Sequence, residues 1–152
     1  MRKKALVAAV IGALTAGALV GGTTIALAQA DIIKTRIDNR KATGPLMREI
    51  KATVDAKGDA KKIVENAAKL KTLEEAFDKM FPAGSDKGET HALPAIWTDT
   101  AGWAAATKAA NDAYDALAVA AGSGDYDKIG PAFANVGKAC GGCHTKFRAK
   151  LN

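Results

Sequence analysis

A short run near the C-terminus, Cys140-Gly141-Gly142-Cys143-His144, places the strongest constraint on the fold. Two thiols three residues apart on a helix lie on nearly the same face. With a histidine directly after the second cysteine, the run has the pattern of a c-type haem attachment site. Each thiol can form a thioether to a haem vinyl group, and the imidazole of His144 becomes the proximal iron ligand. A fold that uses this run has to leave room for a large flat cofactor.

A Cys-x-x-Cys pair can also serve as a redox dithiol, a disulfide or half of a zinc site. A zinc site needs a second pair of ligands, and the chain has no other cysteine and only one other histidine, His91. A thioredoxin-like dithiol usually begins a helix that follows a strand, and no such pattern precedes Cys140. The sequence therefore favours one covalent haem c, with Cys140 and Cys143 as attachment points and His144 as iron ligand.

The N-terminus has the layout of a secretory signal. Three basic residues at positions 2–4 precede an apolar stretch over residues 5–25, and the triplet Ala26-Leu27-Ala28 follows. The stretch is long enough for an uncleaved membrane anchor, but its glycines and the cleavage-type triplet favour removal. We therefore expect residues 1–28 to be a cleaved signal peptide and residues 29–152 to be one mature domain. Export also suits the haem, because c-type haem is attached outside the cytoplasm, in the periplasm.

The charge of the mature domain is small. The whole chain has 22 basic and 16 acidic residues, and three of the basic residues but no acidic one lie in the signal segment. The remaining net charge of +3 argues against a nucleic-acid-binding surface. It gives a weak preference for a redox protein partner with an acidic docking surface.

Hydrophobic periodicity predicts helices and almost no strand. The expected helices cover residues 32–54, 60–80, 99–121 and 125–150, and residues 81–98 form a longer connection with several prolines and glycines. Asp31 and Asp59 are the expected N-caps of the first two helices. Four amphipathic helices in one domain predict an all-α, antiparallel four-helix bundle.

Each predicted helix has one inward face. For the first helix the spacing places Ile33, Ile37, Arg40, Gly44, Met47 and Val54 on that face. In the last helix the two cysteines and His144 share the inward face with the apolar residues. Pro45 lies in the interior of the first helix, where it predicts a kink because proline removes one backbone hydrogen bond.

The chain resembles class II cytochromes c, the cytochrome c′ family, including its low-spin relatives. The likeness rests on a haem motif at the C-terminus rather than the N-terminus, and on the four-helix pattern. It also rests on Leu93-Pro94-Ala95-Ile96-Trp97, which is similar to the family's Pro-x-Ile-Trp segment, and on residues 34–50, which are similar to its first helix. The resemblance covers essentially the whole mature chain.

The resemblance implies roles for four further residues. Arg36 matches the family's characteristic arginine and is expected near a haem propionate, although a solvated helix charge would explain it equally simply. His91 lies in the connection that approaches the haem in the family, and its alternative is an exposed loop histidine. Arg148 is a second candidate neighbour of the propionates. Trp97 is expected against the haem edge or in the core.

The residue that faces the iron opposite the proximal histidine decides function in this family. Low-spin members place a methionine four residues after the characteristic arginine, and high-spin members place an apolar residue there. That position is Arg40 in this sequence, and arginine has no free lone pair for iron. Met47 and Lys41 are the nearest other candidate ligands. We expect a pentacoordinate or weakly hexacoordinate haem iron with a polar distal side.

The resemblance therefore implies a periplasmic haem protein that carries single electrons, and not an enzyme. Its redox protein partner is unknown. A second reading is a module that binds NO or CO at an open iron position. A third and weaker reading is a peroxidase-like enzyme in which Arg40 polarises a peroxide. Family members often form homodimers, so a homodimer is one expected assembly.

Overall fold

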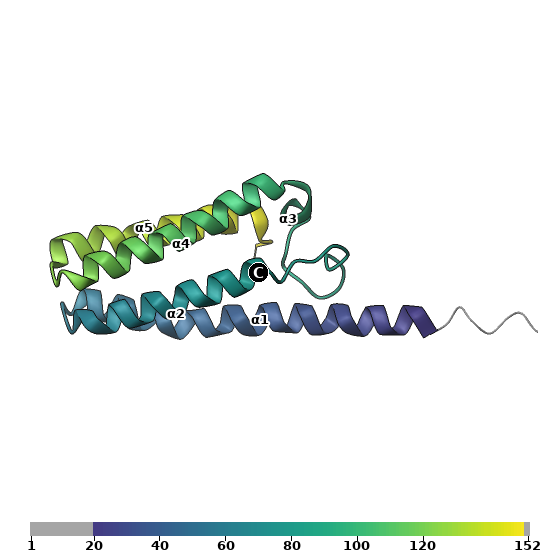
Figure 1. The fold of residues 1–152 in the computed structure, drawn as a ribbon, viewed down its shortest axis with the longest axis horizontal. Coiled ribbons are helices and arrows are strands. Elements are labelled where there is room, and N and C mark those ends of the chain that lie inside the picture. The colour runs from purple at the N-terminus through teal and green to yellow at the C-terminus, as the bar shows by residue number, and fades with distance from the viewer. Residues whose placement is uncertain (1–19, 151–152) are drawn as a thin grey trace, which may run out of the picture.

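The fold is an all-α bundle built from four long helices, seen in a computed structural model that describes residues 20–150. The helices are α1 (Val20–Asp55), α2 (Ala60–Asp78), the short α3 (Ala95–Thr98), α4 (Thr100–Gly122) and α5 (Tyr126–Phe147). Short turns join α1 to α2 and α4 to α5, so each pair is antiparallel. Figure 1 shows the two pairs as two layers, with α3 and the long connection at one end. The predicted four-helix bundle is confirmed.

Aspartate side chains cap the N-terminal ends of α2, α4 and α5. Asp59, the expected N-cap of α2, accepts a hydrogen bond from the Lys61 N–H at 3.0 Å. Asp99 caps α4 in the same way, accepting from the Gly102 N–H at 3.0 Å. The expected cap at Asp31 is wrong, because α1 begins at Val20 and Asp31 lies inside it. The residues before Asp31 are apolar and rich in alanine, so no breaking residue stops the helix there.

The predicted signal segment lies only partly within the described part of the chain. Its basic residues and the first part of its apolar stretch precede residue 20 and lie outside the described residues. Over the described residues, none of the helices combines the length and the apolar character needed to cross a bilayer.

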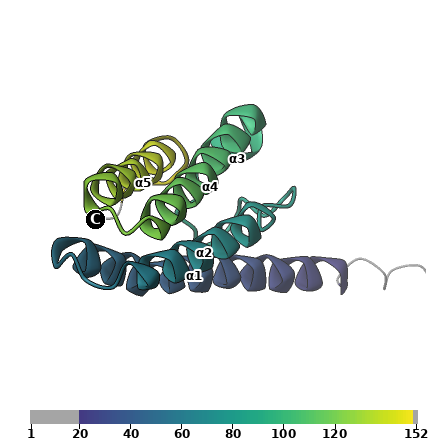
Figure 2. The same ribbon diagram turned by 60° about the vertical axis from the view of Figure 1, so that its left-hand side comes forward.

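Pro45 does not interrupt α1, which continues as one helix to Asp55. Figures 1 and 2 both draw α1 without the kink that Pro45 predicted. Pro45 and Lys41 are both exposed residues, so water can reach this turn and bond to the Lys41 carbonyl that loses its backbone donor. The preceding turn is also tied together, because the Thr43 hydroxyl donates to the Arg40 carbonyl at 2.7 Å.

The main hydrophobic core lies where α2 packs against α4 and α4 against α5. Its fully buried side chains are Ile50, Ile63, Leu70, Leu117, Ile129 and Val136. By contrast α1 packs against α2 and has little contact with α5. In Figure 2 the layer of α4 and α5 diverges from the layer of α1 and α2 toward the α3 end.

This arrangement explains an error in the predicted inward face of α1. Ile37 was expected in the core, but it is 40% exposed, whereas Ile50 is completely buried. Ile37 lines a pocket instead of packing against a neighbouring helix, because α1 and α5 stay apart at that level. The prediction that Ile37 lies on the inward face of α1 was correct, but at that level this face borders a cavity and not another helix.

Candidate haem site

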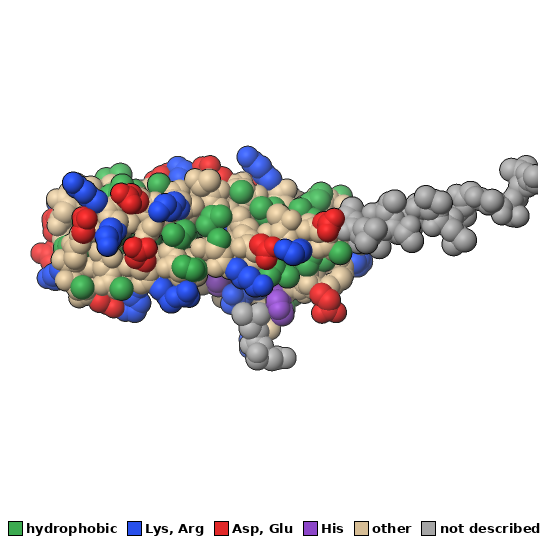
Figure 3. All heavy atoms as spheres, turned by 90° about the horizontal axis from the view of Figure 1, so that it is seen from below, with side chains coloured by type: hydrophobic (Ala, Val, Ile, Leu, Met, Phe, Trp, Pro, Cys, Tyr) green, Lys and Arg blue, Asp and Glu red, His purple; other side chains and the backbone are tan. Residues whose placement is uncertain are grey.

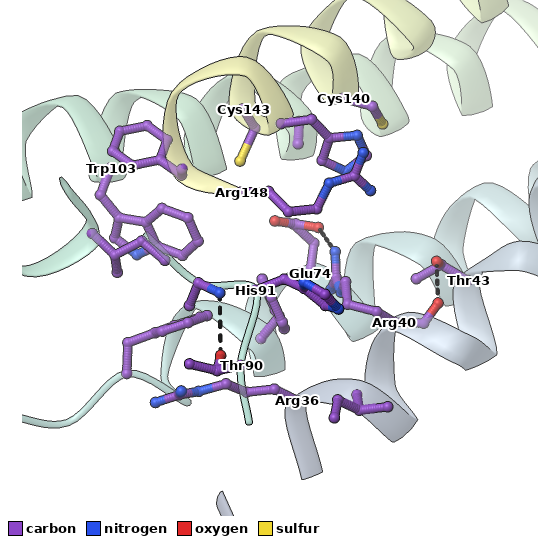
Figure 4. Close-up of a pocket in the computed structure, with 18 of the residues that line it drawn as sticks. Arg36, Arg40, Thr43, Glu74, Thr90, His91, Trp103, Cys140, Cys143 and Arg148 are labelled. Carbon is purple, nitrogen blue, oxygen red and sulfur yellow. Dashed lines mark hydrogen bonds and ion pairs between the residues drawn. The ribbon is translucent and has the colours of Figure 1, made fainter. Parts of the chain in front are cut away.

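A pocket of about 570 Å³ lies between α1 and α5 and is lined by both helices, by α2, by α4 and by the long connection. That volume is in the usual range for a small-molecule site. All five residues predicted to bind the cofactor line it: Cys140, Cys143, His144, Arg36 and His91. Figure 4 shows the cysteines on the α5 wall and Arg36 and Arg40 on the facing α1 wall. The structure therefore brings together residues from three separate parts of the chain.

The α5 wall carries the two thiols one helical turn apart. Both cysteines are free and half-buried, and the Cys140 sulfur lies 4.0 Å from the hydroxyl oxygen of the buried Tyr114. Burial raises the pKa of the Cys140 thiol, and it raises the pKa of the Cys143 thiol to about 11, with the nearby Glu74 carboxylate acting in the same direction. Both thiols are therefore protonated at neutral pH and face an apolar cavity.

His144 follows Cys143 at the rim of the pocket and is exposed overall. Partial desolvation lowers the pKa of its imidazole, and the positive charges of Arg148 and Arg40 lower it further. The imidazole is therefore neutral at pH 7 and keeps a lone pair free for a metal.

This donor set fits a covalently attached haem. Two thiols of correct spacing and a neutral imidazole face one cavity with a largely apolar lining. Among residues 20–150, no three side chains of the His, Cys, Asp or Glu type gather as a group that could hold a metal ion.

Aromatic side chains close the α3 end of the pocket. Phe77 and Trp103 have ring centroids 6.2 Å apart, and Trp103 and Phe147 meet edge to face at 5.3 Å. All three line the pocket. Trp97 belongs to the same aromatic cluster, but it is not among the lining residues, and its indole N–H donates to the Pro82 carbonyl at 3.1 Å. Its position in this structure matches the core-packing alternative.

Arg36 is buried, with 4% of its surface exposed, so the simple reading of a solvated helix charge is wrong. Its Nε donates to the Met80 carbonyl at 2.7 Å and one Nη to the Ser85 carbonyl at 2.8 Å. Its other Nη contacts the Ser85 hydroxyl, and its guanidinium carbon lies 4.3 Å from the centre of the Phe81 ring. Desolvation lowers the pKa of this guanidinium, but arginine remains charged at any physiological pH.

Arg40 also lines the pocket, and its charge is paired by a residue that the sequence reading did not identify. Its Nη1 lies 2.7 Å from a carboxylate oxygen of Glu74, whose side chain is only 7% exposed. The guanidinium stacks over the Phe77 ring at 3.7 Å. Helical spacing could have revealed Glu74, because it follows the buried Leu70 by four residues and so falls on the inward face of α2.

The long connection and the C-terminal segment are tied together at the pocket rim. The Leu93 N–H donates to the Phe147 carbonyl at 3.0 Å, and the Ala149 N–H donates to the His91 carbonyl at 2.8 Å. The last helix therefore ends at Phe147, before the predicted residue 150, because Arg148 is extended and forms a bridge with Ala92. His91 is exposed but lines the pocket, and Figure 3 shows histidine side chains at the surface beside basic ones.

Comparisons with known proteins agree with this site. The sequence model of the family described as Cytochrome C' matches residues 31–148. Cytochrome c′ of Rubrivivax gelatinosus is 43% identical over 60% of this chain and 72% of its own length. Cytochrome c′ of Rhodopseudomonas palustris is 33% identical over 91% of this chain and 95% of its own.

Solved structures show the same fold. Two structures of cytochrome c prime from Alcaligenes xylosoxidans match this one with a TM-score of 0.73 at 31% identity. They cover 80% or 81% of this chain and 97% of their own; both are variants, one with carbon monoxide bound and the other in a nitric oxide complex. The matched region includes both walls of the pocket. This chain therefore belongs to the cytochrome c′ family, whose members carry a covalent haem c with its iron.

Proposed function

We propose that this protein is exported to the periplasm and carries single electrons on one haem c. Cys140 and Cys143 are the attachment residues in this proposal, and His144 is the proximal iron ligand. The observation that carries it is that two half-buried thiols and a neutral imidazole line one pocket of about 570 Å³. When bound, the haem supplies a one-electron couple and an iron centre that can take small ligands.

The chain's own residues set the surroundings of that group. The aromatic wall of Phe77, Trp103 and Phe147 excludes water from one end of the pocket. At the rim, His144, His91 and Arg148 are exposed. An exposed rim lets a redox partner approach one edge of the pocket without any rearrangement of the helices, which suits outer-sphere electron transfer.

Arg36 is the proposed contact for a propionate. The described residues supply acceptors for three of its five N–H groups, so the remaining donors can serve a carboxylate that enters the pocket. His91 and Arg148 lie at the rim and can pair with a propionate that points toward solvent. These roles follow from position and chemistry, and the family resemblance suggests the same for Arg36.

A second candidate function is the binding of NO or CO, and Arg40 favours it. This residue occupies the position where low-spin relatives have a methionine, and it cannot ligate iron. Its guanidinium is bonded to Glu74 and Asn39, so it lies along the wall of the pocket. Variants of a related cytochrome from Alcaligenes xylosoxidans hold these gases, which supports the same ability here.

We do not propose an enzyme. A peroxidase needs a distal group that accepts and returns a proton, and Arg40 stays protonated while engaged with Glu74. His91 has its backbone carbonyl bonded to Ala149 in the clamp at the rim, and it is exposed to solvent. The pocket wall at Arg40 and Glu74 therefore offers a hydrogen-bond donor and a paired carboxylate in place of a free base.

The visible spectrum of the dithionite-reduced holoprotein, before and after carbon monoxide, tests the proposal. We expect a broad high-spin Soret band that sharpens and shifts with the gas, because no side chain at the Arg40 position can ligate iron. A sharp low-spin spectrum that ignores the gas would leave electron transfer as the function and remove gas binding. If that low-spin spectrum became high-spin in Met47→Leu, Met47 would be the sixth ligand.

A further inference from the structure

Arg40 is held rigidly on the pocket wall and retains a free hydrogen-bond donor. Its Nε and one Nη donate to the Asn39 side-chain oxygen at 2.9 and 2.7 Å, and the same Nη also donates to the Leu73 carbonyl at 3.3 Å. Nη1 donates to Glu74 at 2.7 Å. An arginine has five N–H groups, so within the described part of the chain one Nη1 hydrogen has no assigned acceptor.

Glu74 reduces the positive charge that Arg40 contributes to the pocket. Its buried carboxylate forms an ion pair with Arg40, so the two side chains together have no net charge. Pairing offsets part of the desolvation cost of burying the two charges. Phe77 covers one face of the guanidinium and fixes its plane. The Arg40–Glu74 pair therefore presents a preorganised, charge-assisted donor although the pair has no net charge of its own.

We infer that Arg40 and Glu74 form a subsite for small anions, such as fluoride or azide, that ligate ferric haem in this pocket. This inference rests on the proposed function, because the anion binds beside the haem that Cys140 and Cys143 hold. Donors on the distal side of a haem decide which ligands it retains. An anion accepts a stronger hydrogen bond from a guanidinium than a neutral diatomic gas does. Arg40 therefore adds anions to the ligands that an apolar distal wall would accept.

The test is a fluoride titration of the ferric holoprotein, followed by its visible spectrum to give a Kd. Arg40→Leu removes the donor, and we expect fluoride binding to weaken by about 10-fold to 100-fold, the equivalent of one hydrogen bond to a charged group. Glu74→Gln keeps an acceptor for Nη1 but removes the opposing charge. It should therefore tighten fluoride binding several-fold. The proposed subsite therefore predicts opposite shifts of the fluoride Kd, upward in Arg40→Leu and downward in Glu74→Gln.

Two further variants serve as controls, one for the loss of a positive charge and one for the loss of folding. Arg48→Leu removes the same charge from an exposed position of α1 outside the pocket, and should change the Kd less than about 2-fold because exposed charges are screened. Arg40→Leu alone leaves Glu74 buried without its partner and can unfold the protein. The double variant with Glu74→Gln carries neither charge of this pair, and it should bind fluoride as weakly as Arg40→Leu.

Three outcomes would overturn the inference. One is a wild-type fluoride affinity in the double variant, and another is an equal weakening in Arg40→Leu and Glu74→Gln, which indicates a purely structural role. The third is ferric protein that carries covalent haem and, when reduced, binds carbon monoxide, but ignores fluoride. In that last case the proposed function stands while the subsite fails. Protein that never acquires covalent haem contradicts both.

Discussion

Replacing both cysteines, Cys140→Ser together with Cys143→Ser, is expected to abolish covalent haem attachment completely. The chain has no other cysteine, so no other thiol can form a thioether. The measurement is extraction of the purified protein with acidified acetone, which removes non-covalent haem, followed by a haem stain and an intact mass. The wild-type protein should keep its haem through this extraction.

The single variants serve as matched controls. Cys140→Ser and Cys143→Ser each leave one attachment point, so each should retain some covalent haem with an altered spectrum. Both sulfur atoms are half-buried on α5, and serine is close in size, so the helix should not be disturbed. Haem that survives extraction in the double variant would disprove the assignment of this run as the attachment site.

Arg36→Met is expected to lower the free energy of unfolding of the holoprotein by about 3 kcal/mol. The change removes three hydrogen bonds from a charged donor, and it leaves the carbonyls of Met80 and Ser85 without that donor in a buried region. Urea unfolding followed by circular dichroism measures the loss. Hydrogen exchange should also rise in residues 80–88, because Arg36 of α1 donates hydrogen bonds to Met80 and Ser85 in this segment.

Lys34→Met provides the comparison on the same helix. Lys34 is exposed and pairs only with the exposed Asp38 one turn away, so its loss should leave the urea midpoint essentially unchanged. The urea midpoint of Arg36→Lys should fall between those of Arg36→Met and Lys34→Met, since lysine keeps the charge but cannot reach three separate acceptors. An Arg36→Met protein as stable as the wild type would show that the segment is held by other contacts.

Much of the fold followed from local patterns. Asp59 was identified as an N-cap because a short acidic side chain before a periodic segment can satisfy the first free N–H groups of a helix. The same signal at Asp31 predicted a wrong boundary, because no glycine precedes it as Gly58 precedes Asp59, and α1 continues through Asp31. The prediction from Pro45 failed for a different reason: the helix tolerates it on an exposed face, where water can take the place of the missing backbone bond.

The identity of the cofactor also came from a local pattern. The spacing of Cys140, Cys143 and His144 lies within little more than one helical turn, so its chemistry is independent of how the helices pack. The same holds for the position of Arg40, since it is counted along a single helix from Arg36. For both features the sequence alone was sufficient to predict chemical groups that line one pocket.

The partners of the buried charges depended on the tertiary structure. Arg36 bonds to Ser85 and Arg40 to Glu74, residues far away in the chain, and no periodicity states which distant group will meet a given side chain. The path of the connection was equally hidden, because its attachment to the C-terminal segment uses backbone hydrogen bonds at Leu93 and Ala149 that any residue could make. The sequence determined the helices and the attachment chemistry, because both depend on residues close together in the chain. The packing of α1 apart from α5 decided the pocket and the environment of its charges, because contacts between distant residues exist only once the chain has folded.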